Sequence, residues 1–215
     1  PLVVTYHCDI VAGASLFEKL AVWGTSLLGR LSLRRANLIV QNTLDYASSS
    51  PVLSHYLSKT IEIPTPVNVS AVFDDAASDD AISDDAVSND AVASFKARFG
   101  IASDDIVLGL AGRVAREKGY EYLLEALPLV LEAFPNARMV HAGAWKGVIG
   151  EEAYQARITE MASGFGEKWM STGYVSDTDF LAFFAACDVL VFSSLNSTES
   201  FGIVQIESLS QGTPI

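Results

Sequence analysis

The sequence predicts an α/β protein made of two domains, each built on a parallel β-sheet. Short continuous apolar runs, which are typical of strands buried on both faces, alternate with longer segments whose apolar residues recur at helical spacing. One acidic, repetitive segment interrupts this alternation. We therefore expect an N-terminal domain over residues 1–66, a linker over residues 67–93 and a C-terminal domain over residues 94–215.

In the first domain, apolar runs at residues 2–6 and 37–40 predict strands, and helical periodicity predicts helices at about 15–35 and 43–58. The first helix carries large apolar residues on or near one face and arginines at its end: Leu16, Phe17, Leu20, Trp23, Leu27, Leu31, Arg30, Arg34 and Arg35. We expect this face to pack in the core. Peripheral contact with a membrane surface is the alternative.

The linker repeats a five-residue unit over residues 74–93, in the order DDAAS, DDAIS, DDAVS and NDAVA. A period of five matches neither the helix nor the strand, so we expect a solvated segment without an apolar face. Its seven Asp residues carry much of the net charge of −12. A calcium-binding loop is the sharper alternative, but the glycine turn and the terminal glutamate of an EF-hand loop are missing.

In the second domain the alternation is cleaner. Strands are predicted at residues 106–111, 138–142, 168–171 and 189–192, and helices at about 120–134, 151–163 and 178–186. Pro128 should kink the first of these helices. Ser176 and Asp179 have the spacing of an N-cap followed by an acidic first turn, so we expect the last of them to start there.

Composition excludes several classes of protein. Of the 215 residues half are apolar and 19% are charged, which excludes a disordered or collagen-like chain. The acidic balance argues against a nucleic-acid partner.

Cys8 and Cys187 form neither a disulfide framework nor a zinc motif, which fits a reducing cytoplasm. No apolar run is long enough to span a membrane. Because the sequence starts without Met and stops where another strand is due, we expect a fragment of a longer protein.

Two loops of the second domain follow strands, where doubly wound sheets bind ligands. The first is Gly112-Arg113-Val114-Ala115-Arg116-Glu117-Lys118-Gly119. Its glycines permit tight turns, and Arg113 and Lys118 supply the positive charge that a diphosphate requires in an acidic protein. An ordinary surface loop with solvated cations is the alternative.

The second loop runs from Asn196 to a helix that contains Glu207. Glu199 would lie in the loop, Gly202 near the start of the helix and Glu207 about one turn into it. Amides at the start of the helix can meet a phosphate while both carboxylates accept hydrogen bonds from hydroxyls, which favours a sugar or ribose ligand. Alternatively, the two acids only stabilise the start of the helix.

Together, the motifs G-R-V-x-x-x-K-G and E-S-F-G-I-V-Q-I-E, in that order, resemble the retaining glycosyltransferases of family 4. The second motif matches the E-x7-E pattern of that family, and Gly212-Thr213-Pro214 follows as expected. Thr5-Tyr6-His7-Cys8-Asp9 and Ile63-Pro64 extend the resemblance to the first domain. The resemblance implies a GT-B fold, in which two Rossmann-like domains with parallel sheets face a cleft, and both domains would be incomplete here.

The resemblance also implies roles for individual residues. Arg113 and Lys118, with Gly112, would bind the donor diphosphate and stabilise the leaving group. Glu199 would hold the donor sugar, and Glu207 the ribose hydroxyls. His7 would face the sugar from the first domain, although a hydrogen-bonded structural histidine is the alternative. The remaining donor contacts would come from the strand end at Tyr174 and Val175 and from the amides of Phe201, Gly202 and Ile203.

The implied reaction moves a sugar from a UDP-, GDP- or ADP-sugar to a carbohydrate or lipid-linked acceptor, as in surface polysaccharide or glycoconjugate synthesis, in the cytoplasm or at the inner face of the membrane. No metal or cofactor is expected, because the two cations serve at the diphosphate. The other readings are a non-catalytic nucleotide-sugar-binding protein and a sugar phosphorylase of the same fold. The sequence lacks the G-x-G-x-x-G motif of nicotinamide-dependent oxidoreductases, which argues against that class. His141 is expected to be structural and His55 to lie on a helix surface.

Overall fold

The computed structural model describes residues 1–10, 16–67, 87–195 and 199–215. Most of the predicted linker and Asn196, Ser197 and Thr198 lie outside these residues. The chain divides into two compact units. The first holds Pro1–Pro66 and the described residues of Asn196–Gly202, and the second holds the described residues of Val67–Leu195 together with Ile203–Ile215.

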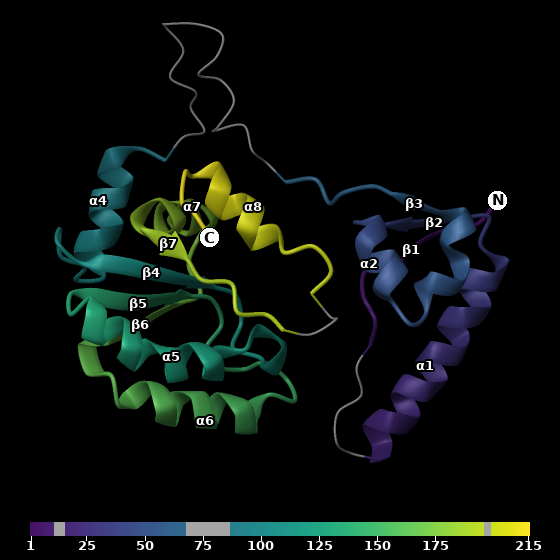
Figure 1. Cartoon of the computed structure of the whole chain (residues 1–215), viewed down its shortest axis with the longest axis horizontal. Coiled ribbons are helices and arrows are strands. Elements are labelled where there is room, and N and C mark those ends of the chain that lie inside the picture. Colours follow the sequence, from purple (N-terminus) through teal and green to yellow (C-terminus); the bar gives the residue numbers. More distant parts are fainter. Residues whose placement is uncertain (11–15, 68–86, 196–198) are drawn as a thin grey trace, which may run out of the picture. The chain divides into compact units, whose positions relative to one another are not determined.

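The first unit is built on a three-stranded parallel sheet in the order β1-β2-β3 (Figure 1). The strands are β1 (Val3–Thr5), β2 (Leu38–Gln41) and β3 (Thr60–Glu62). The helices are α1 (Leu16–Arg35), α2 (Leu44–Ser49) and the 3-10 helix η1 (Leu53–Lys59). The core contains Leu33, Ile39 and Leu53.

The single helix expected at residues 43–58 is wrong, because the chain leaves the helical conformation at Ser50. Ser50 has an extended conformation with ψ of 127° and ends α2. The next residue is Pro51, and a proline disfavours helical geometry in the residue before it. The chain then resumes as η1, in which His55 is exposed as expected.

The expectation that the apolar face of α1 packs in the core is also wrong within the described part of the first unit. Trp23 is 68% exposed and Leu20 60% exposed, whereas Leu33 in the last turn is buried. The side chain of Phe17 lies outside the described residues. Lys59 Nζ donates to the carbonyl oxygens of Leu33 and Ala36 at 2.6 and 2.9 Å. Core contact and capping therefore both fall at the C-terminal end of α1.

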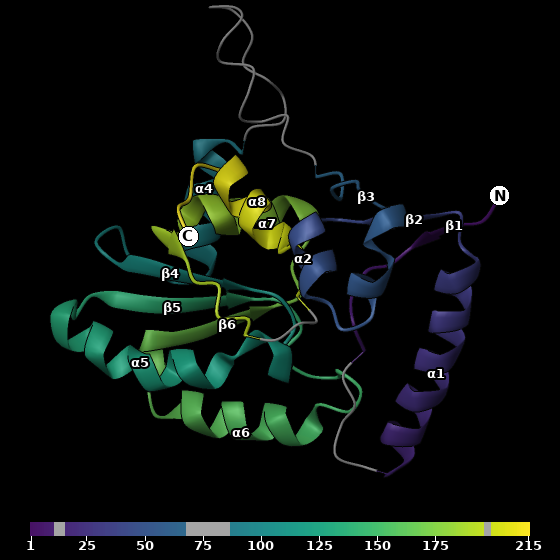
Figure 2. The same cartoon turned by 45° about the vertical axis from the view of Figure 1, so that its right-hand side comes forward.

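The second unit has a four-stranded parallel sheet in the order β6-β5-β4-β7. The strands are β4 (Ile106–Ala111), β5 (Ala137–Ala142), β6 (Trp169–Gly173) and β7 (Val189–Leu190). Two α-helices, α5 (Tyr120–Ala133) and α6 (Glu152–Ser163), cover one face (Figure 2). The opposite face is covered by α4 (Asn89–Arg98), α7 (Asp177–Ala186) and α8 (Ile203–Ser210). Short 3-10 helices are η3 (Arg116–Lys118) and η4 (Gly166–Lys168).

The second unit starts earlier than the predicted domain, because α4 begins inside the segment expected to be linker. The side chain of Ser88 accepts a hydrogen bond from the amide of Ala91 and caps this helix. Val92, Phe95 and Phe99 then recur at helical spacing, and Phe95 is buried in the core. The five-residue repeat therefore gives way to a helical pattern within its last unit.

The other elements lie close to their expected positions. β4 has the predicted bounds, α5 continues through Pro128, and Ser176 caps α7 by accepting from the amide of Asp179. None of the helices in the described part of the chain has both the length and the hydropathy that a bilayer crossing needs.

Candidate functional site

A cavity of about 440 Å³ lies at the carboxyl ends of β4, β5 and β6 in the second unit. This is the edge at which parallel α/β sheets bind ligands. Its lining contains five of the predicted site residues: Gly112, Arg113, Tyr174, Val175 and Glu207. It also contains Asp177 and Phe180 of α7, which sequence reasoning missed. Their spacing of three residues, which puts two side chains on one face of a helix, is the signal that could have found them.

Three glycines join the strand ends around this cavity. The amide of Gly112 donates to the carbonyl of Ala142 at 2.9 Å, and the amide of Gly143 donates to the carbonyl of Gly173 at 2.9 Å. Gly143 has a φ of 144°, and a Cβ atom there would overlap the carbonyl oxygen of Gly112. The close approach of the loops after β4 and β5 therefore requires glycine at position 143.

His141 lies in β5, next to Ala142 of the cavity wall, and is fully buried. Its Nε2 is 2.7 Å from the carbonyl oxygen of Gly112, and its Nδ1 is 2.9 Å from Ser171 Oγ. Burial lowers the pKa of His141 to about 4, so the ring is neutral at pH 7. The hydroxyl of Tyr120 donates to the same carbonyl of Gly112 at 3.1 Å. These contacts agree with the expected structural role of His141 and tie it to the site.

Arg113 lines the cavity with a largely exposed side chain. Its Nη2 atom is 2.8 Å from Glu117 Oε1, four residues further along the loop. Glu117 is a third residue that sequence reasoning missed, although it lies between the two expected cations of the motif. The guanidinium is therefore held by an acid on its own loop.

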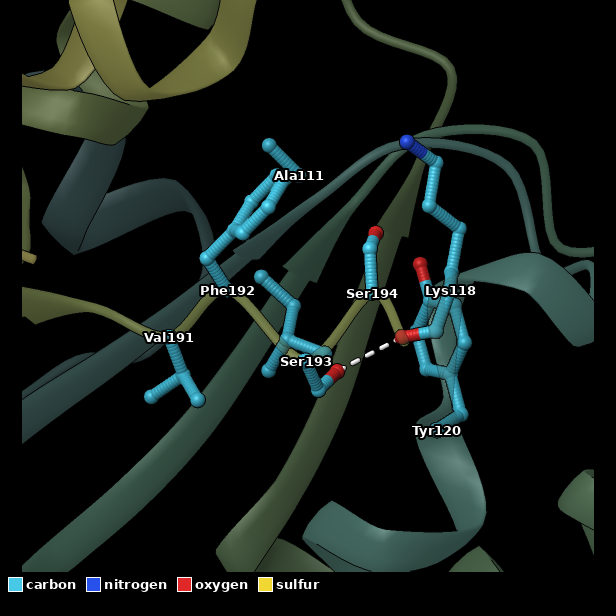
Figure 3. Close-up of a pocket in the computed structure, with 8 residues that line it drawn as sticks. Ala111, Lys118, Tyr120, Val191, Phe192, Ser193 and Ser194 are labelled. Carbon is cyan, nitrogen blue, oxygen red and sulfur yellow. Dashed lines mark hydrogen bonds between the residues drawn. The ribbon is translucent and has the colours of Figure 1, made fainter. Parts of the chain in front are cut away.

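Lys118 lines a second, much smaller cavity of about 10 Å³, beside Phe192, Ser193 and Ser194 (Figure 3). Its carbonyl oxygen accepts a hydrogen bond from Ser193 Oγ at 2.6 Å, and its ammonium group lies 6.0 Å from the centre of the Phe192 ring. Gly119 follows with a φ of 65°, and a Cβ atom there would overlap the carbonyl oxygen of Ser193. The end of the loop is therefore packed on the segment that follows β7.

Glu207 extends from α8 into the wall of the larger cavity. It is half-buried, and burial raises the pKa of its carboxyl group. Ile203 begins α8, so Glu207 lies about one turn into that helix, as predicted. A half-buried carboxylate at this position can accept hydrogen bonds from ligand hydroxyls.

The remaining predicted residues belong to the first unit. His7 is exposed after β1, and its carbonyl oxygen accepts a hydrogen bond from Gln41 Nε2 at 3.3 Å. Glu199 Oε1 accepts from the amide of Gly202 at 3.2 Å, just before α8. Phe201 lies between these two residues and is partly buried. The roles given to all the site residues stay predictions.

Asp9 holds the loop that contains His7 and was also missed as a positioning residue. It is 7% exposed, and its carboxylate accepts hydrogen bonds from Tyr6, Ser50 and Tyr46 at 2.8, 2.9 and 3.1 Å. A buried carboxylate with three hydroxyl donors is well satisfied. An acid inside the apolar run at residues 8–12 is the signal that sequence reasoning could have used.

Comparison with known proteins supplies family and fold. The family model described as "Glycosyl transferases group 1" matches residues 92–215, which include every site residue of the second unit. An uncharacterized glycosyltransferase of Methanocaldococcus jannaschii is 31% identical over 124 residues, covering 57% of this chain and 29% of that protein. Mannosylfructose-phosphate synthase of Agrobacterium fabrum is 33% identical over 122 residues, covering 55% of this chain and 26% of that protein.

The fold is similar to that of Anabaena HepE, whose crystal structure was solved in complex with UDP-glucose. The TM-score is 0.76 at 18% identity, over 100% of this chain and 52% of that one. This chain therefore spans about half the length of that structure, and its matches cover less than a third of the two relatives above. The predicted fold class, an α/β GT-B fold with parallel sheets, is confirmed.

Proposed function

This chain belongs to the glycosyl transferases group 1 family, and we propose that it is part of a transferase that moves a sugar from a nucleoside-diphosphate sugar to a hydroxyl group of an acceptor. The observation that carries this proposal is the cavity at the strand ends, which unites Gly112 and Arg113 with Glu207 and the turn at Tyr174. Its volume of about 440 Å³ is in the range of small-molecule sites.

The parts of the cavity suit the parts of such a donor. Glycine at position 112 lets the backbone approach a diphosphate, and the Arg113 guanidinium offers it a positive charge. Glu207 would accept hydrogen bonds from the ribose hydroxyls. Tyr174 and Val175 would contact the base, and Tyr174, which is 89% exposed, leaves a large surface for that contact.

Catalysis in this proposal is mainly electrostatic. As the bond between the sugar and the diphosphate breaks, negative charge grows on the leaving group, and Arg113 and Lys118 stabilise it. We propose that Glu199 and the amides of Phe201, Gly202 and Ile203 orient the sugar, and that His7 contacts it as well. We propose retention of the anomeric configuration, with the leaving phosphate taking the proton of the acceptor hydroxyl. No side chain is assigned as a nucleophile.

We propose a UDP-sugar as the first donor to test, since HepE was crystallised with UDP and with UDP-glucose. GDP- and ADP-sugars are the other donors proposed. The acceptor is a carbohydrate or a lipid-linked saccharide, and the pathway would build surface polysaccharides or glycoconjugates in the cytoplasm. The exposed apolar residues of α1, such as Trp23, support contact with the inner face of the membrane as part of this proposal.

The decisive measurement is the melting temperature of the chain with UDP, GDP, ADP, NAD and phosphate. A ligand at about 100 times its dissociation constant adds about 2.7 kcal/mol to the free energy of unfolding. We expect one nucleoside diphosphate to stabilise the chain, and the Arg113→Ala and Glu207→Ala variants to lose this effect. A response to NAD alone, or one that survives both substitutions, contradicts the proposal. Proton NMR of the anomeric centre in the product of a turnover assay tests retention.

A further inference from the structure

We propose that His141 is a positioning residue of the donor site, which sets the spacing between the loop that binds the diphosphate and the turn that contacts the base. This inference rests on the proposed function. It is carried by one hydrogen-bond network, which runs from Gly173 through Ser171 and His141 to Gly112, a residue that lines the cavity. Gly112 precedes Arg113 in the loop, and Gly173 precedes Tyr174 in the turn.

The partners define the direction of every hydrogen bond in this network. A carbonyl oxygen only accepts, so the proton of the neutral imidazole is on Nε2 and is donated to Gly112. Nδ1 then accepts from the hydroxyl of Ser171 at 2.9 Å. Ser171 Oγ in turn accepts from the amide of Gly173 at 3.3 Å. With the proton on Nε2, both ring nitrogens of His141, the carbonyl of Gly112 and the hydroxyl of Ser171 therefore all have hydrogen-bond partners.

Both ends of this hydrogen-bond network, at Gly112 and at Gly173, are fixed by further contacts. The carbonyl of Gly112 also accepts from Tyr120, and its amide donates to Ala142, so the peptide groups on both sides of Gly112 are held. At the other end, the carbonyl of Gly173 accepts from the amide of Gly143. The backbone that leads to Arg113 and the backbone that leads to Tyr174 are thus joined through the imidazole of His141, in addition to their backbone hydrogen bonds with the end of β5.

The ring of His141 cannot turn away from these partners. It packs edge-to-face against Tyr120 and Trp145, with ring centres 5.4 and 5.3 Å apart. An aliphatic side chain would fill a buried position in β5 without the cost of burying a polar group. The polar contacts, rather than packing, therefore explain a histidine at this position.

A spacing device makes a prediction that a purely structural residue does not. If His141 sets the distance between two subsites, its loss weakens a ligand that spans both but not a ligand that occupies one. Uridine, guanosine or adenosine alone, and pyrophosphate alone, should bind the variant about as well as the wild type. The matching nucleoside diphosphate should bind about tenfold more weakly.

The test compares four variants of the full chain: His141→Leu, His141→Gln, Ser171→Ala and Leu127→Ala. Leucine removes both hydrogen bonds of residue 141, whereas glutamine keeps a donor and an acceptor. Ser171 is exposed, so its substitution breaks the hydrogen-bond network without opening the core. Leu127 is fully buried in α5 and takes no part in this network, so Leu127→Ala controls for lost stability. Hydrogen exchange of the segments 112–119 and 173–176, without ligand, is measured beside the dissociation constants.

We expect faster exchange in both segments for His141→Leu and in the 173–176 segment for Ser171→Ala, with His141→Gln close to the wild type. Equal exchange in His141→Leu, Ser171→Ala and Leu127→Ala would overturn the positioning role, whether or not a nucleotide binds. If His141→Leu weakened the binding of nucleosides and pyrophosphate as much as the binding of the nucleoside diphosphate, the spacing role would be overturned. If the wild type binds no nucleoside diphosphate, the proposed function and the spacing role both fail, while hydrogen exchange still decides the link between the two segments.

Discussion

Arg113 and Glu117 form an ion pair within one loop, with Nη2 and Oε1 2.8 Å apart. The loop that is expected to attract a diphosphate therefore carries a negative charge next to its first cation. A bound diphosphate and Glu117 would compete for the same guanidinium, so this acid limits the affinity of the site.

Replacing Glu117 with Gln should strengthen the binding of a nucleoside diphosphate by about threefold, because a partly exposed charge pair of this kind is worth about 1 kcal/mol or less. Isothermal titration at low and at high salt measures the effect, which should shrink as salt screens the charges. Glu125→Gln on the adjacent helix is the control for net charge. Weaker binding would mean that Glu117 orients Arg113 for the ligand instead of competing with it.

Replacing Gly143 with Ala should disrupt the site more than it disrupts an ordinary turn. The new methyl group would meet the carbonyl oxygen of Gly112 in a backbone with a φ of 144°, and we expect a loss of about 3 kcal/mol in the free energy of unfolding. Gly147→Ala is the matched control, since it also has a positive φ, of 78°, but open space around it. It should lose about 1 kcal/mol. Urea denaturation compares the two, and equal losses would show that the backbone contact is not tight.

Replacing Glu207 with Gln should stabilise the folded chain at pH 7 while weakening nucleotide binding. Burial raises the pKa of this carboxyl group above that of the unfolded chain, so the ionised form is disfavoured in the fold. The stabilising gain should shrink as the pH falls through the folded pKa, and vanish below the ordinary glutamate pKa of about 4.3, where both states are protonated. Melting temperatures of both proteins across this range measure the gain. A loss of stability at pH 7 would show that the carboxylate makes net favourable contacts.

Acid should destabilise the second unit through His141. The pKa of this residue is about 4 in the fold, below its ordinary value of 6.5, so between these values the unfolded chain binds a proton that the folded chain does not. This difference costs up to about 1.4 kcal/mol for each pH unit. The free energy of unfolding of His141→Gln should therefore fall less steeply than that of the wild type between pH 6.5 and 4. Parallel slopes would show that His141 takes up its proton in the folded state.

Sequence reasoning located most elements of the second unit because its strands are continuous apolar runs that end at glycines, as β4 does before Gly112. It failed where a neighbour in space or a single residue decided the outcome. Pro51 ended a helix that periodicity alone would have continued. The apolar residues of α1 had the pattern of a core face, but the described contacts of that helix fall in its last turn.

The candidate site was predicted through its charged residues and glycines, which recur in a recognisable order along the chain. Its supports were not predicted. Ser171 and Gly112 meet at His141 although they are 30 and 29 residues away from it in sequence. Such contacts arise from the register of parallel strands, which a single sequence does not contain.

The serine that caps α4 is also a member of the five-residue repeat. Serine recurs at positions 78, 83 and 88, each time followed by two residues drawn from Asp and Asn and then by Ala. Gain or loss of one whole five-residue repeat would therefore bring an equivalent serine to the start of the helix, followed by the same acidic first turn. Replication slippage in the corresponding gene segment would then change the length of the segment between the first and the second unit, while the second unit would still begin at a capped helix.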